Sequence, residues 1–377
     1  MGNPEIISII SFIICILFIL FAIFLLTVKT EKRLSNLLLS TFLLVTATDI
    51  SVFFYSRFMD LPAILEMLRI QISDFKDPLL FLYFLSLIYS DFKLKTKHLI
   101  HTAPWLISMI ILTPNFFLVS HDDQIIFLQN FGQSEESVWL RKKGYLLEIV
   151  YLIAEIYYII RYRSLLLENF TDKTSFYKYR WLKQLLIFIL IGQALTFTKG
   201  IIRETESDTV TNVARVFLLS YGLFFTFWLV LKALYSPKLF RGIPIELKLS
   251  KEIMAEKVVK NEASDAIKNQ IIVLKEYMDT EAPYLNPSLT VQKLAFQTGL
   301  PAKELSVLIN QHLNQHFFDF INSYRIKKAT EILSDTSKKQ VTVLEILYEV
   351  GFNSKSSFNT AFKKHTGTTP TAYRKSN

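Results

Sequence analysis

Three acidic residues lie in long apolar stretches of the amino-terminal half, where an ionised side chain is costly and is therefore a candidate for function. Asp49 lies in one such stretch, and Glu148 and Glu155 lie seven residues apart on one face of a predicted helix. Together they could form a polar pocket that senses a ligand or a proton. Hydrogen bonds between neighbouring apolar helices are the alternative interpretation. Other polar residues in or at the ends of such stretches are Gln193, Lys199 and Arg215.

A second candidate for chemistry is the pair His312 and His316, whose spacing of four residues matches two metal ligands on one helix face. Asn314 lies between them, and we expect it to end the helix in a left-handed turn that separates the two imidazoles. Cys15 is the only cysteine, which excludes an internal disulfide and a cysteine-based metal site. The sequence contains no Walker loop, dinucleotide-binding glycine motif or nucleophile elbow. We therefore expect no metal, no cofactor and no enzymatic activity.

The composition divides the chain into two parts. Of the 377 residues, 51% are hydrophobic and 20% are charged, and the mean hydropathy is +0.31. A soluble globular protein of this length has to cover itself with more polar surface, so a purely cytosolic enzyme is excluded. The long apolar blocks end near residue 234. We predict an all-α fold with a transmembrane bundle at 1–234, a linker at 235–266 and a soluble domain at 267–377.

Seven apolar segments approach the length of about 20 residues that a helix needs to cross a bilayer. The third is interrupted by Asp74, Lys76 and Asp77, and the fifth is short, so six spans are the main alternative. We expect the first to remain as a span, because no basic residue precedes it and no small-residue cleavage site follows it. The segments are Ile6–Val28, Leu34–Phe54, Ile70–Tyr89, Leu99–Leu118, Gly144–Ile160, Trp181–Ile202 and Val213–Leu234.

Basic residues indicate the orientation of these spans, because Lys and Arg are enriched in the cytoplasmic loops of membrane proteins. With the amino terminus outside, the cytoplasmic pieces carry 15 Lys and Arg residues and the outer pieces carry 7. The cytoplasmic pieces are then 29–33, 90–98, 161–180 and 235–251, and the outer pieces are 1–5, 55–69, 119–143 and 199–212. We therefore expect a multi-pass membrane protein whose carboxyl-terminal part lies in the cytoplasm.

The carboxyl-terminal part is basic and begins with helices. Residues 235–377 hold 20 Lys and Arg residues against 14 Asp and Glu residues, which suggests nucleic acid or anionic lipid as a partner. The charged stretch 246–260 predicts a linker helix. An apolar stripe then predicts the first helix of a domain, in preference to a coiled coil of barely two heptads. The stripe consists of Ile267, Ile271, Leu274 and Met278.

Two units of similar pattern follow, at 289–309 and 341–362. In each, a short helix with an apolar pair reaches a glycine, Gly299 or Gly351, and a polar turn leads into a second helix. Glycine suits a sharp helix end because it adopts positive φ without strain. This is the pattern of a helix-turn-helix, present twice around a joining helix predicted at 317–333. The side chains expected to cap these helices are Thr290, Thr342 and Ser354.

The second unit and the residues after it carry a dense set of motifs. These are Gly351-Phe352-x-Ser354, Phe358, Phe362-Lys363-Lys364, Gly367-x-Thr369-Pro370 and Tyr373-Arg374. They resemble the AraC/XylS family of bacterial transcription regulators, and Arg325 and Ala329 match its joining helix. The resemblance covers about 267–373, and the whole chain resembles the membrane-bound members, in which several spans precede the DNA-binding domain.

This resemblance implies a cytoplasmic seven-helix domain whose two recognition helices enter successive major grooves of double-stranded DNA. It also implies the bacterial inner membrane as the location and RNA polymerase as a partner. Residues off the apolar stripes of the two second helices are the candidates for DNA contact, with Lys363 and Lys364 expected on phosphate. The full set is Lys303, Glu304, Ser306, Val307, Asn310, Ser354, Lys355, Ser356, Asn359, Thr360, Lys363 and Lys364. The aromatic residues predicted to form core are Phe352, Phe358 and Phe362.

We interpret the chain as a membrane-tethered, sequence-specific transcription regulator. A signal of unknown identity at the spans would alter homodimerisation or orientation at 246–278. Two departures from the family pattern are Leu347, in place of a small residue, and Thr360, where arginine is frequent. They support an alternative in which the helix-turn-helix domain of a membrane receptor binds a protein partner. The other alternative is a transporter with an appended regulatory domain.

Overall fold

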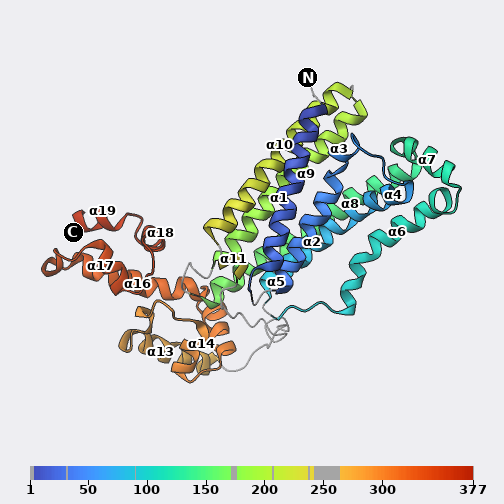
Figure 1. Cartoon of the computed structure of the whole chain (residues 1–377). Coiled ribbons are helices and arrows are strands. Elements are labelled where there is room, and N and C mark those ends of the chain that lie inside the picture. Colours follow the sequence, from blue (N-terminus) through green and yellow to red (C-terminus); the bar gives the residue numbers. More distant parts are fainter. Residues whose placement is uncertain are drawn as a thin grey trace. The chain divides into compact units, whose positions relative to one another are not determined.

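The computed structural model describes residues 4–30, 33–89, 91–170, 176–205, 208–236, 238–241 and 264–376. Within these ranges the chain is all-helical, as predicted, and it divides into two units (Figure 1). The amino-terminal unit contains residues 1–159 and 181–255, and the carboxyl-terminal unit contains residues 160–180 and 256–377. The linker helix predicted at 246–260 lies outside the described residues.

Long apolar helices dominate the amino-terminal unit. These are α1 (Pro4–Thr27), α2 (Arg33–Ile50), α8 (Glu135–Asn169), α9 (Tyr177–Thr205) and α10 (Asp208–Tyr235). Shorter helices and turns connect them: α3 (Val52–Tyr55), α4 (Ala63–Gln71), η1 (Ile72–Phe75), α5 (Lys76–Ile88), η2 (Thr96–Thr102), α6 (Ala103–Leu112), η3 (Thr113–Phe117), α7 (His121–Asn130), η4 (Phe131–Gln133) and α11 (Lys238–Arg241). Figure 1 shows α1, α2, α9 and α10 running side by side.

Polar side chains tie these helices together where they pack. The amide nitrogen of Asn36 on α2 donates to the carbonyl oxygens of Leu25 (3.2 Å) and Phe240 (3.1 Å), which joins α1, α2 and α11. The indole of Trp181 on α9 is buried and donates to the hydroxyl of Tyr83 on α5 at 2.8 Å. Such hydrogen bonds between apolar helices give polar side chains partners that neither hydrocarbon nor an apolar protein interior can provide.

Five described helical segments are long and apolar enough to cross a membrane. They are Pro4–Thr27, Arg33–Tyr55, Thr96–Phe117, Tyr177–Arg203 and Thr209–Tyr235. The third segment predicted from the sequence is divided, because the turn η1 separates α4 from α5, which has only 13 residues. The fifth lies inside the 35-residue helix α8. The count of seven spans therefore stays a prediction.

The carboxyl-terminal unit has two apolar cores that share one helix. The first core gathers α13 (Ser264–Thr280), α14 (Val291–Thr298), α15 (Ala302–Val307) and the beginning of α16 (Phe317–Ser334). The second gathers the end of α16 with α17 (Val343–Glu349) and α18 (Lys355–Thr366), with Tyr373 of α19 (Pro370–Ser376) against it. The shorter turns η6 (Pro283–Leu285), η7 (Leu308–His312) and η8 (Thr336–Lys338) complete the unit. The joining helix predicted at 317–333 is thus α16.

The predicted core residues of this unit occupy these two cores. Leu274 and Met278 are fully buried in the first core, with Ile267 and Ile271 packed against it. The second core contains the predicted aromatic residues and also Leu347, whose side chain is fully buried. The aromatic residues are Phe352, Phe358 and Phe362.

The two turn glycines differ in their surroundings. Gly299 has φ +70°, with open space around the position that a Cβ would take. Gly351 has φ +88°, and a Cβ there would lie 2.7 Å from the carbonyl oxygens of Tyr284 and Leu285. Positive φ alone disfavours a side chain at Gly299, whereas at Gly351 the backbone of a distant turn also excludes it.

We expect Gly351→Ala to reduce the free energy of unfolding of fragment 262–377 by about 3 kcal/mol, from backbone strain and from overpacking. The matched control Gly299→Ala should cost about 1 kcal/mol, because it adds strain alone. Urea denaturation followed by circular dichroism measures both values. Equal losses in the two variants would contradict the close approach at Gly351.

Candidate nucleic-acid interface

The first helix-turn-helix consists of α14, the turn 299–301 and α15. The Thr290 hydroxyl accepts a hydrogen bond from the backbone N–H of Lys293 at 3.3 Å, which caps α14 as predicted. The helix ends at Gly299, and the backbone N–H of Leu300 returns to the carbonyl of Ala295. Pro301 then precedes the first residue of α15, so the second helix begins immediately after the turn.

The second helix-turn-helix consists of α17, the turn 350–354 and α18. Thr342 and Glu345 form a reciprocal cap, in which each accepts a hydrogen bond from the backbone N–H of the other. The carboxylate of Glu345 accepts hydrogen bonds from both the backbone N–H and the hydroxyl of Thr342, and these two bonds lower the pKa of Glu345. The Ser354 hydroxyl accepts from the backbone N–H of Ser357 at 3.2 Å, so the predicted caps at Thr342 and Ser354 are both confirmed.

On the first recognition helix, the candidate residues have two kinds of environment. Lys303 and Glu304 are exposed, whereas Ser306, Val307 and Asn310 are half-buried. The amide nitrogen of Asn310 donates to the hydroxyl of Ser306 at 3.2 Å, and its amide oxygen is buried with no hydrogen-bond partner among the described residues. The end of this helix is the π-helical turn η7. Lys303 and Glu304 are therefore the candidates that the fold presents most openly.

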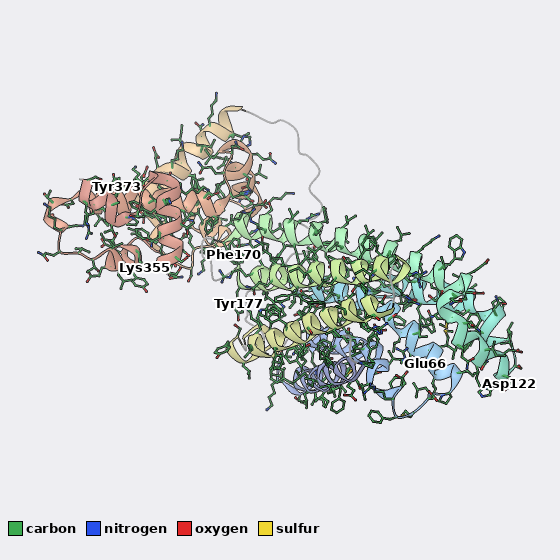
Figure 2. The ribbon with its side chains drawn as sticks, turned by 90° about the horizontal axis from the view of Figure 1, so that it is seen from above. Glu66, Asp122, Phe170, Tyr177, Lys355 and Tyr373 are labelled. Atoms are coloured by element: carbon green, nitrogen blue, oxygen red, sulfur yellow. The ribbon has the colours of Figure 1, made fainter. Side chains whose placement is uncertain are left out.

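On the second recognition helix, most candidates are exposed. Ser354 and Asn359 are half-buried, and the hydroxyl of Thr360 donates to the carbonyl of Ser356 at 2.7 Å. Lys364 forms an ion pair of 2.6 Å with Asp319 of α16, so its charge is partly neutralised within the domain. The exposed candidates are Lys355, Ser356, Thr360, Lys363 and Lys364. Figure 2 labels Lys355, at the start of α18, and Tyr373, on α19, within this unit.

A histidine next to these lysines adds no charge to the surface. Desolvation, together with the charge of Lys364, lowers the pKa of His365, while Asp319 opposes this shift. Its imidazole is therefore neutral near pH 7, and the exposed positive charge of this helix comes from its lysines.

The two histidines that could have formed a metal pair lie in different elements. Asn314 has φ +49°, which confirms the predicted left-handed residue. His312 ends η7, and His316 precedes α16. They therefore do not occupy successive turns of one helix, which is the arrangement that a pair spaced by four residues needs.

Arg325 holds the two helix-turn-helix units together, a role that the sequence did not reveal. Its side chain on α16 is 1% exposed, and the guanidinium donates to the carbonyl oxygens of Tyr284 (2.7 Å) and Asn286 (2.9 Å). The same group lies 5.4 Å from the ring centre of Phe352, in the turn of the second unit. The sequence singled out Arg325 only because it matches the joining helix of the AraC/XylS family. That match does not predict which groups the guanidinium contacts.

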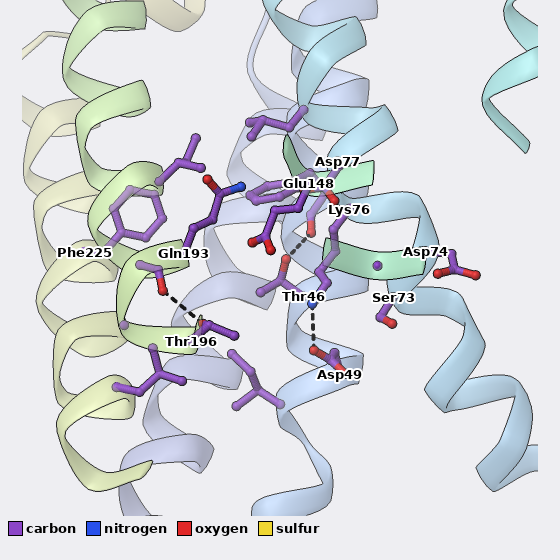
Figure 3. Close-up of a pocket in the computed structure, with 18 of the residues that line it drawn as sticks. Thr46, Asp49, Ser73, Asp74, Lys76, Asp77, Glu148, Gln193, Thr196 and Phe225 are labelled. Atoms are coloured by element: carbon purple, nitrogen blue, oxygen red, sulfur yellow. Dashed lines mark hydrogen bonds and ion pairs between the residues drawn. The ribbon is translucent and has the colours of Figure 1, made fainter. Parts of the chain in front are cut away.

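The acidic residues predicted as a sensor site lie in the amino-terminal unit, where the structure brings two of the three to one cavity. Asp49 and Glu148 line a cavity of about 620 Å³ between helices, together with Lys76, Asp77 and Gln193 (Figure 3). Glu155, on α8, is buried but does not line this cavity. Lys76 and Asp77, which the sequence presented only as interruptions of a span, belong to the cavity.

Comparison with known proteins finds similarity over about a third of the chain or less. The profile of the helix-turn-helix domain family matches residues 294–376. An uncharacterised helix-turn-helix-type transcriptional regulator of Pseudoalteromonas carrageenovora is 29% identical over 138 residues, which are 35% of this chain and 76% of that protein. The melibiose operon regulatory protein of Escherichia coli K12 is 26% identical over 125 residues, 32% of this chain and 40% of that protein. Residues 294–376 are therefore similar to helix-turn-helix domains, as the two capped units of the structure indicate.

A solved structure is also similar to part of the chain. It is the carboxyl-terminal domain of AraT, a response regulator of Geobacillus stearothermophilus, with 26% identity and a TM-score of 0.25. The match covers 31% of this chain and 89% of that one. The chain spans less than half the length of the melibiose operon regulatory protein that it matches. The two relatives are named as regulators of transcription or of an operon.

We expect Arg325→Met to reduce the free energy of unfolding of fragment 262–377 by about 3 kcal/mol, because two carbonyl oxygens lose a charged donor. The matched control is Lys328→Met on the same helix, whose side chain is largely exposed, and it should change stability by less than about 0.5 kcal/mol. Thermal unfolding of fragment 262–377 measures both. A loss no larger in Arg325→Met than in the control would contradict the role of the guanidinium.

Proposed function

We propose that this chain is a membrane-tethered, sequence-specific transcription regulator of the bacterial inner membrane. Its amino-terminal unit receives a signal, and its AraC-type domain binds double-stranded DNA at the cytoplasmic face. The observation that carries the proposal is the combination, in one chain, of two capped helix-turn-helix units on a shared helix with several helices apolar enough to span a bilayer. Homodimerisation and contact with RNA polymerase belong to the same proposal.

The surface of the apolar helices supports the membrane location. Large apolar side chains of α1 are exposed along its whole length, and similar residues are exposed on α6, α9 and α10. A continuous apolar surface of this kind is unfavourable in water and suits hydrocarbon. The exposed large apolar residues of α1 are Ile6, Ile9, Phe12, Ile13, Ile16, Ile19, Leu20, Ile23 and Leu26.

The buried state of Leu347 bears on the alternative in which this domain binds a protein partner. A larger side chain in place of a small one could have distorted the second unit. Leu347 instead lies fully buried in the second core, and both turns keep their glycine conformation. The fold needed for DNA contact is therefore intact at this departure, and the lost arginine at Thr360 concerns a single contact.

DNA binding is tested with the full chain in lipid nanodiscs and with fragment 262–377, which contains both apolar cores. Selection from a random duplex pool should yield a preferred sequence, with affinity that falls steeply as salt rises. Lys363→Ala should lower the slope of log K against log salt by about 0.9, because one phosphate contact is lost. The control Lys327→Ala, on the joining helix, should leave the slope unchanged. Failure to retain any duplex at low salt would refute the regulator.

The orientation is tested by labelling engineered cysteines in a Cys15→Ser background, which removes the single natural thiol. In intact spheroplasts, a membrane-impermeant maleimide should label Asp122→Cys, in a piece predicted to lie outside. It should label Lys95→Cys and Ser337→Cys only after lysis, because these positions are predicted to be cytoplasmic. The unaltered chain, whose Cys15 is buried, serves as the control. Labelling of Ser337→Cys in intact spheroplasts would overturn the topology.

A further inference from the structure

The cavity between the helices of the amino-terminal unit is large enough for a small ligand. Its volume is about 620 Å³, within the range of about 300–1,000 Å³ typical of ligand sites. Residues from α2, α5, α8, α9 and α10 line it, and all of them belong to one unit. Figure 3 shows Glu148 from α8 and Gln193 from α9 projecting into the space beside Lys76, Asp77 and Thr46.

Several charges around this cavity are already neutralised within the fold. The ammonium of Lys76 lies 2.9 Å from a carboxylate oxygen of Asp49. Arg69 pairs with Glu66 at 2.7 Å and also donates to the backbone carbonyl of Asp49. The carboxylate of Asp74 pairs with Lys143 at 2.6 Å and accepts from a serine hydroxyl. These groups are unavailable as the main binding charges for a ligand.

Three groups of the cavity have acceptor oxygens that a ligand could use, although the side chain of Gln193 already donates one hydrogen bond to the carboxylate of Glu148. Neither Asp77 nor Glu148 forms an ion pair in the part of the chain that the structure describes. The amide oxygen of Gln193 is buried, and it has no hydrogen-bond partner among those same residues. A buried acceptor without a donor is unfavourable, so this group of acceptors favours a ligand that brings N–H donors and positive charge.

The remaining lining residues define the shape of such a ligand. Helix α9 contributes three lining residues in the order Phe188, Gln193 and Lys199. An aromatic ring, an acceptor and a cation therefore occur in turn along this side of the cavity. Six residues, or about 9 Å along the helix axis, separate Lys199 from Gln193. On α10, Phe225 adds a second ring at the aromatic end, and Figure 3 shows it beside Gln193. The cavity thus presents the acceptor oxygens of Glu148, Asp77 and Gln193 near an aromatic surface.

We propose that this cavity binds a small organic monoamine, with its ammonium at Glu148, Asp77 and the amide oxygen of Gln193 and its apolar body against Phe188 and Phe225. An ammonium carries three N–H donors, which matches the three acceptors, and aromatic rings next to a cation stabilise it further. The proposal deepens the proposed function by naming the class of signal that the amino-terminal unit receives. Lys199 disfavours ligands with a second positive charge.

Binding is measured by calorimetry on the full chain in nanodiscs, with empty nanodiscs subtracted to remove partition into lipid. The probes are phenethylamine and hexylamine, each compared with its neutral counterpart, 2-phenylethanol or hexanol, and with the anion 3-phenylpropionate. Saturable binding of the amines is expected, with the alcohols and the anion at least tenfold weaker. Equal affinity for an amine and its alcohol, or no saturable amine binding, would overturn the proposal.

Substitution tests the acceptors directly. Glu148→Gln should weaken amine binding at least tenfold, because it removes the negative charge and keeps the size of the side chain. The matched control is Glu155→Gln, the same change on the same helix but outside the cavity lining, and it should bind within twofold of the natural chain. Asp77→Asn gives a second variant should Glu148→Gln fail to fold. An equal loss in Glu148→Gln and Glu155→Gln would refute the site.

The outcome is separate from that of the DNA experiments. If the chain binds amines but retains no DNA, the proposed ligand site stands and the proposed role as a transcription regulator is refuted. If it retains DNA but binds no amine, only the proposed class of ligand is refuted. Phenethylamine added to the full chain bound to its selected duplex then tests the link. A change in DNA affinity that Glu148→Gln abolishes is expected, and an unchanged affinity would refute the amine as the signal.

Discussion

The guanidinium of Arg325 is the interaction on which the arrangement of the carboxyl-terminal unit depends. It is almost fully buried, and a buried cation is unfavourable unless polar partners surround it. Its partners come from the turn before the first helix-turn-helix, at Tyr284 and Asn286, and its central carbon lies 5.4 Å from the ring centre of Phe352 in the second. Gly351 adds to this constraint, because its backbone approaches the same turn so closely that no side chain fits. The two recognition helices are therefore oriented by segments that have to fold together.

Local chemistry explains why so much of this unit could be predicted from the sequence. Thr290, Thr342 and Ser354 cap the helices that follow them, and each cap depends on residues within three positions. Gly299 and Gly351 adopt positive φ because a helix ends at each of them, and the local sequence is enough to predict these ends. The partners of Arg325 lie 41 and 39 residues away, and nothing in the local pattern specifies them. Such contacts follow from how the two cores meet on α16, which hydrophobic spacing alone does not determine.

The amino-terminal unit was harder to predict because its charges interact between helices. Asp74, Lys76 and Asp77 suggested an incomplete span, yet Lys76 pairs with Asp49 and Asp74 with Lys143, each on another helix. Spacing placed Glu148 and Glu155 on one helix face, as a single candidate site. Seven residues are about 10 Å along a helix, however, and the cavity that includes Glu148 does not reach Glu155. The spacing of residues predicts on which face of a helix a side chain lies, but not where along that helix the neighbouring helices leave a cavity.

The two units have separate apolar cores, which limits the ways in which a signal received by one unit could act on the other. A ligand shifts an equilibrium only by the difference in its affinity for two states, and couplings between sites are typically about 1–3 kcal/mol. That energy is too small to unfold a domain whose two cores are joined through Arg325 and α16. It is similar to the discrimination that one good base contact provides, at about 1–3 kcal/mol. A signal that changes only the pairing or orientation of two intact domains, and so disengages one recognition helix from its groove, would therefore suffice to change the affinity for DNA about 5- to 150-fold.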